Sequence, residues 1–199
     1  MIYLENIIIK DNTFPGSHVL KKNFSLQCSE LNIIVGNQGS GKSTLLKMLQ
    51  SNHKDLEIQL SEFVKKNGVK TFYFDTEKDN PRIKDVDTYT SPSGESRGYG
   101  YGNALRSRFR SHGEVLEELI IEPLLKAKDC VVFLDEPESG LSIKNQLRFI
   151  NAIDVAIKNN CQLFIATHCY PLIEENEVIS FDIFEKLSGK NYINSIKNE

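Results

Sequence analysis

Short runs of apolar residues alternate with longer amphipathic segments along this chain, which predicts strands alternating with helices. Residues 31–35, 130–134 and 161–166 are almost uniformly apolar, as expected of strands that are buried on both faces of a sheet. Looser apolar patterns predict further strands at residues 1–10, 24–27, 69–74 and 178–181. The alternation favours an α/β fold with a mainly parallel core sheet flanked by helices.

Apolar residues at helical spacing predict helices between these strands, at residues 42–49, 56–66, 114–126 and 142–158. Asn67 and Gly68 are expected to end the second helix, and Pro123 is expected to kink or shorten the third. The last helix is expected to bury one face, made of Ile143, Leu147, Ile150, Ile153 and Ile157.

Residues 75–113 differ in composition from the rest of the chain. Gly, Ser, Tyr, Asp and Arg dominate this stretch, and it has no long apolar stripe. We expect it to form a polar, partly helical subdomain. Residues 1–199 are then a single domain that carries a reduced subdomain at about residues 76–127.

The composition is typical of one globular domain, with 199 residues of which 40% are hydrophobic and 26% charged. Lys and Arg number 24 against 27 Asp and Glu, so the formal charge of −3 excludes a globally basic surface for nucleic acid. No apolar run approaches the roughly 18 residues of a membrane span, so no direct membrane insertion is expected. The first residues lack the basic start of a secretory signal, and we expect a cytoplasmic protein.

The four cysteines, Cys28, Cys130, Cys161 and Cys169, contain no C-x-x-C pair, and their neighbours are mostly apolar. This pattern is typical of reduced thiols in a cytosolic protein. We therefore expect partly buried free thiols and no disulfide framework.

A glycine-rich segment connects the predicted strand 31–35 to the predicted helix 42–49. It fits the phosphate-binding P-loop pattern G-x-x-x-x-G-K-[ST] at every position and reads Gly36-Asn37-Gln38-Gly39-Ser40-Gly41-Lys42-Ser43-Thr44. Its glycines let backbone N–H groups turn toward phosphate oxygens, and the following helix points its positive end at the same anion. Lys42 can reach the β- and γ-phosphates, and the Ser43 hydroxyl can ligate Mg²⁺. We expect ATP to bind here with Mg²⁺.

An acidic pair, Asp135 and Glu136, follows the buried strand 130–134. Such a pair alone is more often a solvated turn, but P-loop proteins hold the Mg²⁺ shell with a carboxylate at this place. Asp135 is therefore expected to hold Mg²⁺, and Glu136 to orient or deprotonate the attacking water.

Thr167 and His168 follow the predicted strand 161–166 at the edge where parallel sheets bind ligands. His168 is expected to hydrogen-bond the γ-phosphate or the water, although a lone His in a turn is more often a surface residue. The other histidines, His18, His53 and His112, have no such support and are expected to lie on the surface.

The order of these motifs along about residues 1–181 resembles that of an ABC-type ATPase. The P-loop is followed by Ser111-His112-Gly113-Glu114, then by Leu134-Asp135-Glu136-Pro137-Glu138, then by Thr167-His168. The resemblance implies a P-loop NTPase fold of the ABC type, in which Ser111 and Gly113 contact the γ-phosphate held by the opposite subunit. It therefore implies a homodimer that forms on ATP binding. A helix N-cap box at Ser111 and Glu114 is compatible with the same residues.

Three details resemble the soluble members of that superfamily, which include SMC-like heads, RecF-like heads and small stand-alone ATPases. Glu114 and Glu138 stand where transporter subunits usually carry Gln and Thr, and Thr167-His168-Cys169-Tyr170-Pro171 is similar to Thr-His-Ser-Pro. The chain has no heptad run for a coiled-coil arm.

Two features depart from the family pattern. The stretch after the predicted strand 69–74 contains no Gln, and Asp75 or Glu77 is expected to substitute for it. The loop after Glu138 reads Ser139-Gly140-Leu141-Ser142, where many relatives end in Asp. The residue that stacks on adenine is open between Phe14 and Tyr3, although aromatic residues such as these are more often buried in the core.

Arginines and tyrosines gather between residues 82 and 110, where basic residues exceed acidic ones. Three roles remain open for them: contact with nucleic acid, neutralisation of the nucleotide or partner subunit, and a solvated face. We expect ATP hydrolysis by a head-to-tail dimer that acts with a DNA-related, defence or repair partner such as a nuclease. The alternatives are an ATP-gated clamp with little turnover, the ATP-binding subunit of a membrane transporter, and a small P-loop kinase.

Overall fold

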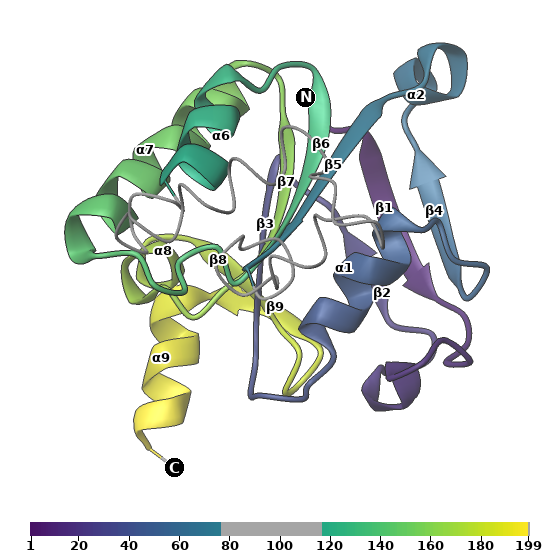
Figure 1. Ribbon diagram of the computed structural model, residues 1–199. Helices are drawn as coiled ribbons and strands as arrows, with labels where there is room; N and C mark the ends of the chain where they lie inside the picture. Colours follow the sequence, from purple (N-terminus) through teal and green to yellow (C-terminus); the bar gives the residue numbers. More distant parts are fainter. Residues whose placement is uncertain (77–116, 199) are drawn as a thin grey trace, which may run out of the picture.

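The computed structural model describes residues 1–76 and 117–198, and its centre is a six-stranded sheet in the order β5-β6-β7-β3-β8-β9 (Figure 1). Neighbouring strands run parallel except for the last pair, β8 and β9, which is antiparallel. The strands are β3 (Leu31–Val35), β5 (Lys70–Asp75), β6 (Cys130–Asp135), β7 (Gln162–Ala166), β8 (Glu177–Ser180) and β9 (Glu185–Ser188). The predicted α/β fold with a mainly parallel core sheet is confirmed.

A separate antiparallel sheet has the order β2-β1-β4, formed by β2 (Ser25–Gln27), β1 (Leu4–Ile9) and β4 (Leu56–Leu60). The predicted helix over residues 56–66 is therefore wrong in its first half. Leu56, Ile58 and Leu60 alternate with polar residues, and pairing with β1 settles them as a strand. The short helix α2 (Glu62–Asn67) begins after Ser61, whose Oγ accepts the Val64 N–H, and it ends before Gly68 as predicted.

The long helix α7 (Ile143–Lys158) has the predicted extent, but its buried face differs in part from the prediction. Ile143 and Leu147 are 79% and 55% exposed. The prediction holds for Ile153, which is buried, and for Ile150 and Ile157, which are partly buried against the same cluster. The fully buried face is made of Phe149, Ala152, Ile153 and Ala156, which follow the i, i+3, i+4, i+7 spacing of a helix packed on a sheet.

The remaining helices are short. They are the 3₁₀ turn η1 (Ser17–Val19), α1 (Lys42–Gln50), the π-helical turn η3 (Glu117–Ile121), α6 (Glu122–Lys126), α8 (Tyr170–Glu174) and α9 (Gly189–Lys197). Pro123 lies in the first turn of α6, where its missing N–H costs no helical hydrogen bond, so the predicted helix divides near this residue. Among these described helices, none is long and apolar enough to cross a lipid bilayer.

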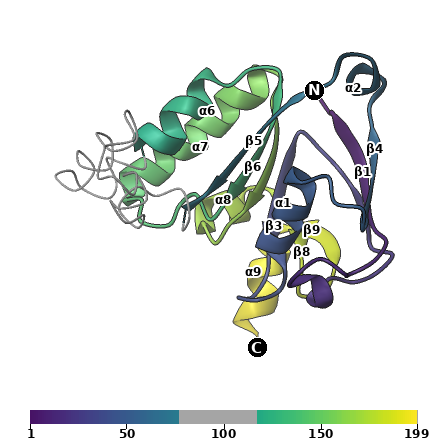
Figure 2. The ribbon, with the colours of Figure 1, turned by 45° about the vertical axis from the view of Figure 1, so that its right-hand side comes forward.

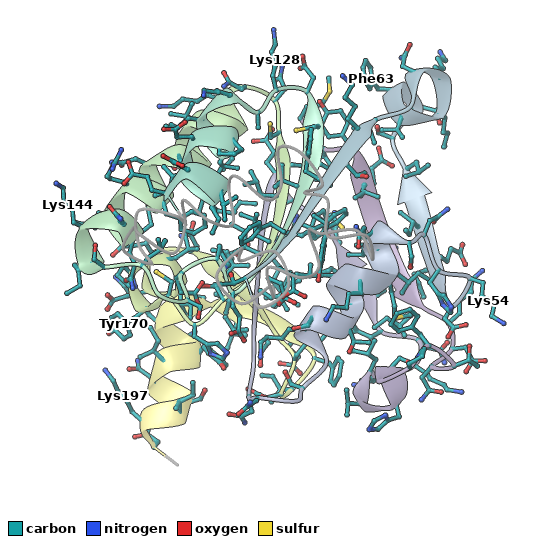
Figure 3. The ribbon with its side chains drawn as sticks, viewed as in Figure 1. Lys54, Phe63, Lys128, Lys144, Tyr170 and Lys197 are labelled. Carbon is teal, nitrogen blue, oxygen red and sulfur yellow. The ribbon has the colours of Figure 1, made fainter. Side chains whose placement is uncertain are left out.

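Helices α6 and α7 lie on one face of the six-stranded sheet, and α1 and the antiparallel sheet lie on the other (Figure 2). An apolar cluster covers each face. One lies between the sheet and the helices α6 and α7, and the other lies between the sheet, α1 and the antiparallel sheet. Long charged side chains such as Lys54, Lys128 and Lys144 project away from these layers (Figure 3).

All four cysteines are free and buried, so the predicted reduced thiols are confirmed and are more deeply placed than expected. Burial raises the pKa of Cys28 and of Cys130 to about 12, which keeps both thiols protonated. Cys130 begins β6 and Cys161 directly precedes β7, with their Sγ atoms 3.5 Å apart. The cysteines therefore belong to the core. The predicted subdomain at about residues 76–127 lies largely outside the described residues and stays a prediction.

Candidate functional site

The P-loop lies between β3, in the interior of the core sheet, and α1. Gly39 and Gly41 have φ angles of 82° and 98°, in the left-handed region that favours glycine. A Cβ at Gly41 would approach Leu20 Cδ2 to 2.6 Å, so this position has no room for a side chain. Because Gly41 is also the N-cap of α1 and offers no side-chain bond, the first N–H groups of α1 are left for an anion.

Lys42 lies inside the loop with only 5% of its surface exposed. Its Nζ donates to the carbonyl oxygens of Gly36 at 2.8 Å and Asn37 at 3.0 Å. Burial lowers the pKa of Lys42, while the carboxylates of Glu136 and Asp182 act in the opposite direction. The loop therefore encloses a cationic group that its own carbonyl oxygens hold in place.

Ser43, in the first turn of α1, lies next to Asp135 at the end of β6. Ser43 Oγ donates to Asp135 Oδ1 at 2.9 Å, and the Tyr73 hydroxyl donates to Oδ2 at 3.4 Å. Burial raises the pKa of Asp135, and the Ser43 hydrogen bond partly offsets this effect. Asp75 ends the neighbouring strand β5, beside Asp135, and lies 3.6 Å from Lys47 Nζ.

The chemistry of these oxygen donors fits Mg²⁺, which binds through one or two carboxylates together with phosphate oxygens and water. Ser43 and Asp135 are the residues that would hold it. The described residues contain no group of three or more His, Cys, Asp or Glu side chains arranged to hold a metal ion. The donor set therefore suits a cation that arrives with a phosphate ligand better than a cation bound by protein alone.

Glu136 and His168 lie together at the mouth of the site, on the turns that follow β6 and β7. Glu136 Oε1 is 3.6 Å from His168 Nε2, and these side chains are 44% and 53% exposed respectively. Glu136 has a φ of 49°, and its N–H donates to Ala166 O at 2.9 Å, which joins the two turns. The structure thus brings together the two residues that the sequence assigned to water activation and γ-phosphate contact.

A pocket of about 510 Å³ lies beside these groups and is lined by Glu136 but not by His168. Its lining includes Lys42, Ser43, Asp135 and Glu136, together with Gln38, Gly39, Gly41, Thr44, Lys47, Asp75, Thr76, Ser139 and, from the segment of the η1 turn, Gly16, His18 and Val19. The predicted residues Ser111 and Gly113 lie outside the described residues. Ser40 is half-buried, and its Oγ is buried with no hydrogen-bond partner in the described part of the chain. His18 is exposed, as expected. It also lines the pocket, which the sequence did not predict.

Neither candidate for adenine stacking lines this pocket. Tyr3 is fully buried in the core cluster beside the antiparallel sheet. Phe14 packs edge-on against His53, with the ring centroids 5.0 Å apart. Both aromatic rings therefore have structural roles. The pocket is lined by residues of the η1 turn, which carries His18, and not by Phe14 or Tyr3.

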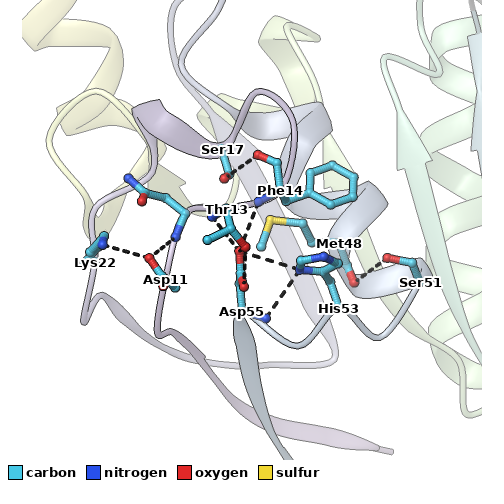
Figure 4. A network of polar contacts seen from close by, with 10 residues as sticks. Asp11, Thr13, Phe14, Ser17, Lys22, Met48, Ser51, His53 and Asp55 are labelled. Carbon is cyan, nitrogen blue, oxygen red and sulfur yellow. Dashed lines mark hydrogen bonds and ion pairs between the residues drawn. The ribbon is translucent and has the colours of Figure 1, made fainter.

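Asp55 anchors the loop that leads into η1 (Figure 4). Its Oδ2 accepts from the Thr13 N–H at 2.7 Å and the Phe14 N–H at 3.0 Å, and the Thr13 hydroxyl donates to the same carboxylate. Ser17 Oγ in turn donates to Phe14 O at 2.6 Å. The position of His18 thus depends on a carboxylate that is 37 positions further along the chain, and no local motif marks it.

The chain is similar to known proteins of the ABC type. The ABC transporter family model matches residues 20–85, which include the P-loop. A solved structure of a metal-chelate type ABC transporter in an inward-facing conformation is 19% identical, with a TM-score of 0.60 over 96% of this chain and 85% of that chain.

A nucleotide-free ATP-binding cassette from an ABC transporter is 14% identical, with a TM-score of 0.56 over 100% of this chain and 96% of that chain. A search of curated proteins found no match. The assignment to SMC-like or RecF-like heads stays a prediction. What the similarities show is that this chain has the fold of an ABC-type ATP-binding cassette.

Proposed function

We propose that this chain binds ATP with Mg²⁺ and hydrolyses it to ADP and phosphate. The observation that carries the proposal is the 2.9 Å hydrogen bond between Ser43 and Asp135 beside the buried ammonium of Lys42. It places a hydroxyl, a carboxylate and a cation at one end of a P-loop helix, as phosphoryl transfer to water requires.

The P-loop residues Gly36, Asn37, Gln38, Gly39, Ser40, Gly41, Lys42, Ser43 and Thr44 bind the triphosphate through backbone N–H groups and the ammonium of Lys42. Ser43 and Asp135 hold Mg²⁺, which neutralises charge on the phosphate oxygens when bound. Glu136 orients the attacking water and accepts its proton, and His168 donates a hydrogen bond to the γ-phosphate.

The mouth of the site is open, and we propose that a second copy of the chain closes it. Glu136 and His168 are about half exposed, so hydrogen bonds made there compete with bulk water. Ser111 and Gly113 of a second copy would complete the γ-phosphate site in a head-to-tail homodimer. Such closure excludes water and strengthens every electrostatic contact inside.

We assign the base of the nucleotide to the wall of the pocket that the η1 turn forms. His18 and Val19 line that wall and present an imidazole ring and an aliphatic side chain. An aromatic or aliphatic surface suits a flat base, and the imidazole adds one hydrogen-bonding nitrogen. This assignment replaces Phe14 and Tyr3 as contacts of adenine.

The direct test is phosphate release from Mg²⁺–ATP by the wild-type protein, with Lys42→Ala as the matched negative control. We expect turnover that rises with protein concentration, because dimerisation completes the site. Light scattering should show dimers with a nonhydrolysable analogue and monomers without it. Absence of analogue binding by the wild type would refute the proposal.

The exposed mouth favours a second function, an ATP-gated clamp with little turnover. Closure on a nucleic acid or nuclease partner would then be the output, and hydrolysis would reset the clamp. Dimerisation with ATP but phosphate release that is negligible until DNA is added would favour the clamp. Phosphate release that is unaffected by DNA would favour the plain ATPase.

A further inference from the structure

Glu138 is a carboxylate at the site that the proposed mechanism does not use. It lies two residues after Glu136, and its side chain crosses from the turn after β6 to the turn after β7. There its Oε1 accepts the backbone N–H of His168, 30 residues further along the chain. The bond joins the segment of the proposed general base to the segment of the proposed γ-phosphate contact.

The two turns make further contacts. The Glu136 N–H donates to Ala166 O at 2.9 Å, and the side chains of Glu136 and His168 approach to 3.6 Å. Within its own turn, Glu138 O accepts the Leu141 N–H at 2.9 Å, which fixes the backbone from which its carboxylate extends. The Glu138 carboxylate is therefore a fixed acceptor for the His168 N–H.

The imidazole of His168 has little packing to define its place, because its side chain is 53% exposed. Its direction is then set mainly by its backbone. The neighbouring N–H groups of Thr167 and Cys169 donate to Ile34 O and Thr167 Oγ1, and the His168 N–H itself donates to Glu138. Hydrogen bonds to an ionised acceptor are about twice as strong as neutral ones. A catalytic group that shifts by about 1 Å can lose about a hundredfold in rate.

The second oxygen of Glu138 has a different environment. Glu138 Oε2 is buried and has no hydrogen-bond partner in the described part of the chain. An unsatisfied buried carboxylate oxygen is unfavourable for folding, and such groups persist where they have a task. Burial lowers the pKa of Lys42, and the Glu138 carboxylate is one of those that act in the opposite direction, after Glu136, Asp182 and Asp135.

We propose that Glu138 is a positioning residue, whose carboxylate fixes the His168 backbone and so aims the imidazole at Glu136 and the γ-phosphate. The inference rests on the proposed ATPase function. Glu138 does not touch the nucleotide in this assignment, and its effect on hydrolysis passes through His168.

The test is a double-mutant cycle with Glu138→Ala, His168→Ala and the double variant, measured by phosphate release and by binding of a nonhydrolysable ATP analogue. We expect Glu138→Ala to lower kcat by about tenfold or more, with analogue affinity within about twofold of wild type. Because Glu138 acts through His168, the double variant should be no slower than His168→Ala. Effects of the two substitutions that multiply would overturn the inference.

Two further variants separate positioning from stability. Glu138→Gln keeps an acceptor oxygen and should recover most of the lost rate, even if Glu138→Ala proves too unstable to measure. Glu57→Ala removes an exposed carboxylate of β4, 2.9 Å from Lys10 and remote from the pocket, and should leave the rate unchanged. A Glu138→Gln variant as slow as His168→Ala would also overturn the inference.

The amide resonance of His168 in ¹H–¹⁵N NMR spectra gives a readout that does not require activity. A hydrogen bond to a carboxylate moves this proton downfield, and we expect the shift to diminish in Glu138→Gln. An unchanged resonance would show that the bond is absent and would sink the inference. If the resonance moves but the wild type hydrolyses no ATP, the proposed function fails while the contact stands. If the wild type is active and Glu138→Ala hydrolyses ATP at the same rate, the inference alone fails.

Discussion

The two walls of the proposed nucleotide pocket are built in different ways. The phosphate wall consists of the P-loop after β3 and of residues that end or follow β5 and β6, all strands of one parallel sheet, and His168 after β7 lies at its edge beside Glu136. The η1 wall consists of the η1 turn, which reaches the pocket from a loop beside the antiparallel sheet. One wall is set by strand register and the other by side-chain hydrogen bonds.

This difference determines how each wall depends on the rest of the chain. The register pairs Asp135 with Ala166 and Ile34 with Ala166, so the turns after these three strands must meet at one edge. The η1 turn has no such partner strand, and its loop is held by the Asp55 carboxylate. Substitutions on the phosphate wall should therefore affect chemistry, whereas those on the η1 wall should affect recognition of the base.

The largest effect is expected from Glu136→Gln on the phosphate wall. The amide keeps the shape of the side chain but cannot accept the proton of the attacking water, so kcat should fall by about 10²–10⁴. ATP should still bind, and the dimer should accumulate in light scattering because the closed state is not released. If this variant turned over ATP like the wild type, the base would have to be another residue.

The next effect is expected from Ser43→Ala, which removes the hydroxyl that donates to Asp135. The concentration of Mg²⁺ that half-saturates analogue binding should rise by about 10–100-fold, since a ligand is lost and the carboxylate loses its orienting partner. A Mg²⁺ titration of analogue binding measures this shift. Ser51→Ala, at the far end of α1, is the matched control and should leave the titration unchanged.

The difference between strand register and side-chain hydrogen bonds also explains how much of the molecule could be predicted from the sequence. Buried strands such as β3 and β6 are short apolar runs, and they were placed within one residue of their observed ends. Residues 56–60 fit both a helical and an alternating pattern, and only pairing with β1 decided between them. Ile143 and Leu147 fit the same helical stripe as the buried Ile153, but they are exposed, and the packing of α7 on the sheet buries Phe149, Ala152 and Ala156 beside Ile153.

The residues of the candidate site also differ in whether the sequence could predict them. Lys42, Ser43 and Asp135 could be found because a P-loop and a carboxylate at a strand end have local patterns and their strands share a sheet. His18 could not be found, because its position depends on hydrogen bonds to the distant Asp55. Tyr3 and Phe14 were poor candidates for the same reason, since aromatic composition does not tell a pocket wall from a core.

His18→Ala, on the η1 wall, is expected to have a smaller effect, and this effect is on ATP binding. Loss of a ring contact with the base should weaken ATP binding by about 2–10-fold. Binding of tripolyphosphate, which has no base, should not change. Isothermal titration of both ligands measures the two affinities, and His18→Phe should restore most of the ATP affinity. Equal weakening for ATP and tripolyphosphate would mean that His18 contacts the phosphates.

The smallest effect on nucleotide binding is expected from Asp55→Asn, whose main consequence is for stability. Burial alone raises the pKa of Asp55, but hydrogen bonds from Thr13 and Phe14 outweigh it and hold the pKa below its ordinary value of 3.8. The folded state thus favours the ionised form, and this stabilisation is present at neutral pH and is lost as pH falls below the ordinary pKa.

Thermal unfolding of the wild type and Asp55→Asn at pH 7 and at about pH 3 checks the sign of this effect. The Tm difference between the two proteins should be large at pH 7 and should shrink at the lower pH, where the wild-type carboxylate is increasingly protonated. Glu57→Gln is the matched control on β4, and its Tm should stay near that of the wild type at both pH values, since its ion pair with Lys10 is exposed. A Tm difference for Asp55→Asn that is the same at both pH values would show that the charge of Asp55 does not hold the loop. The position of His18 would then depend on the shape of the Asp55 side chain alone, and the two walls would differ less than we infer.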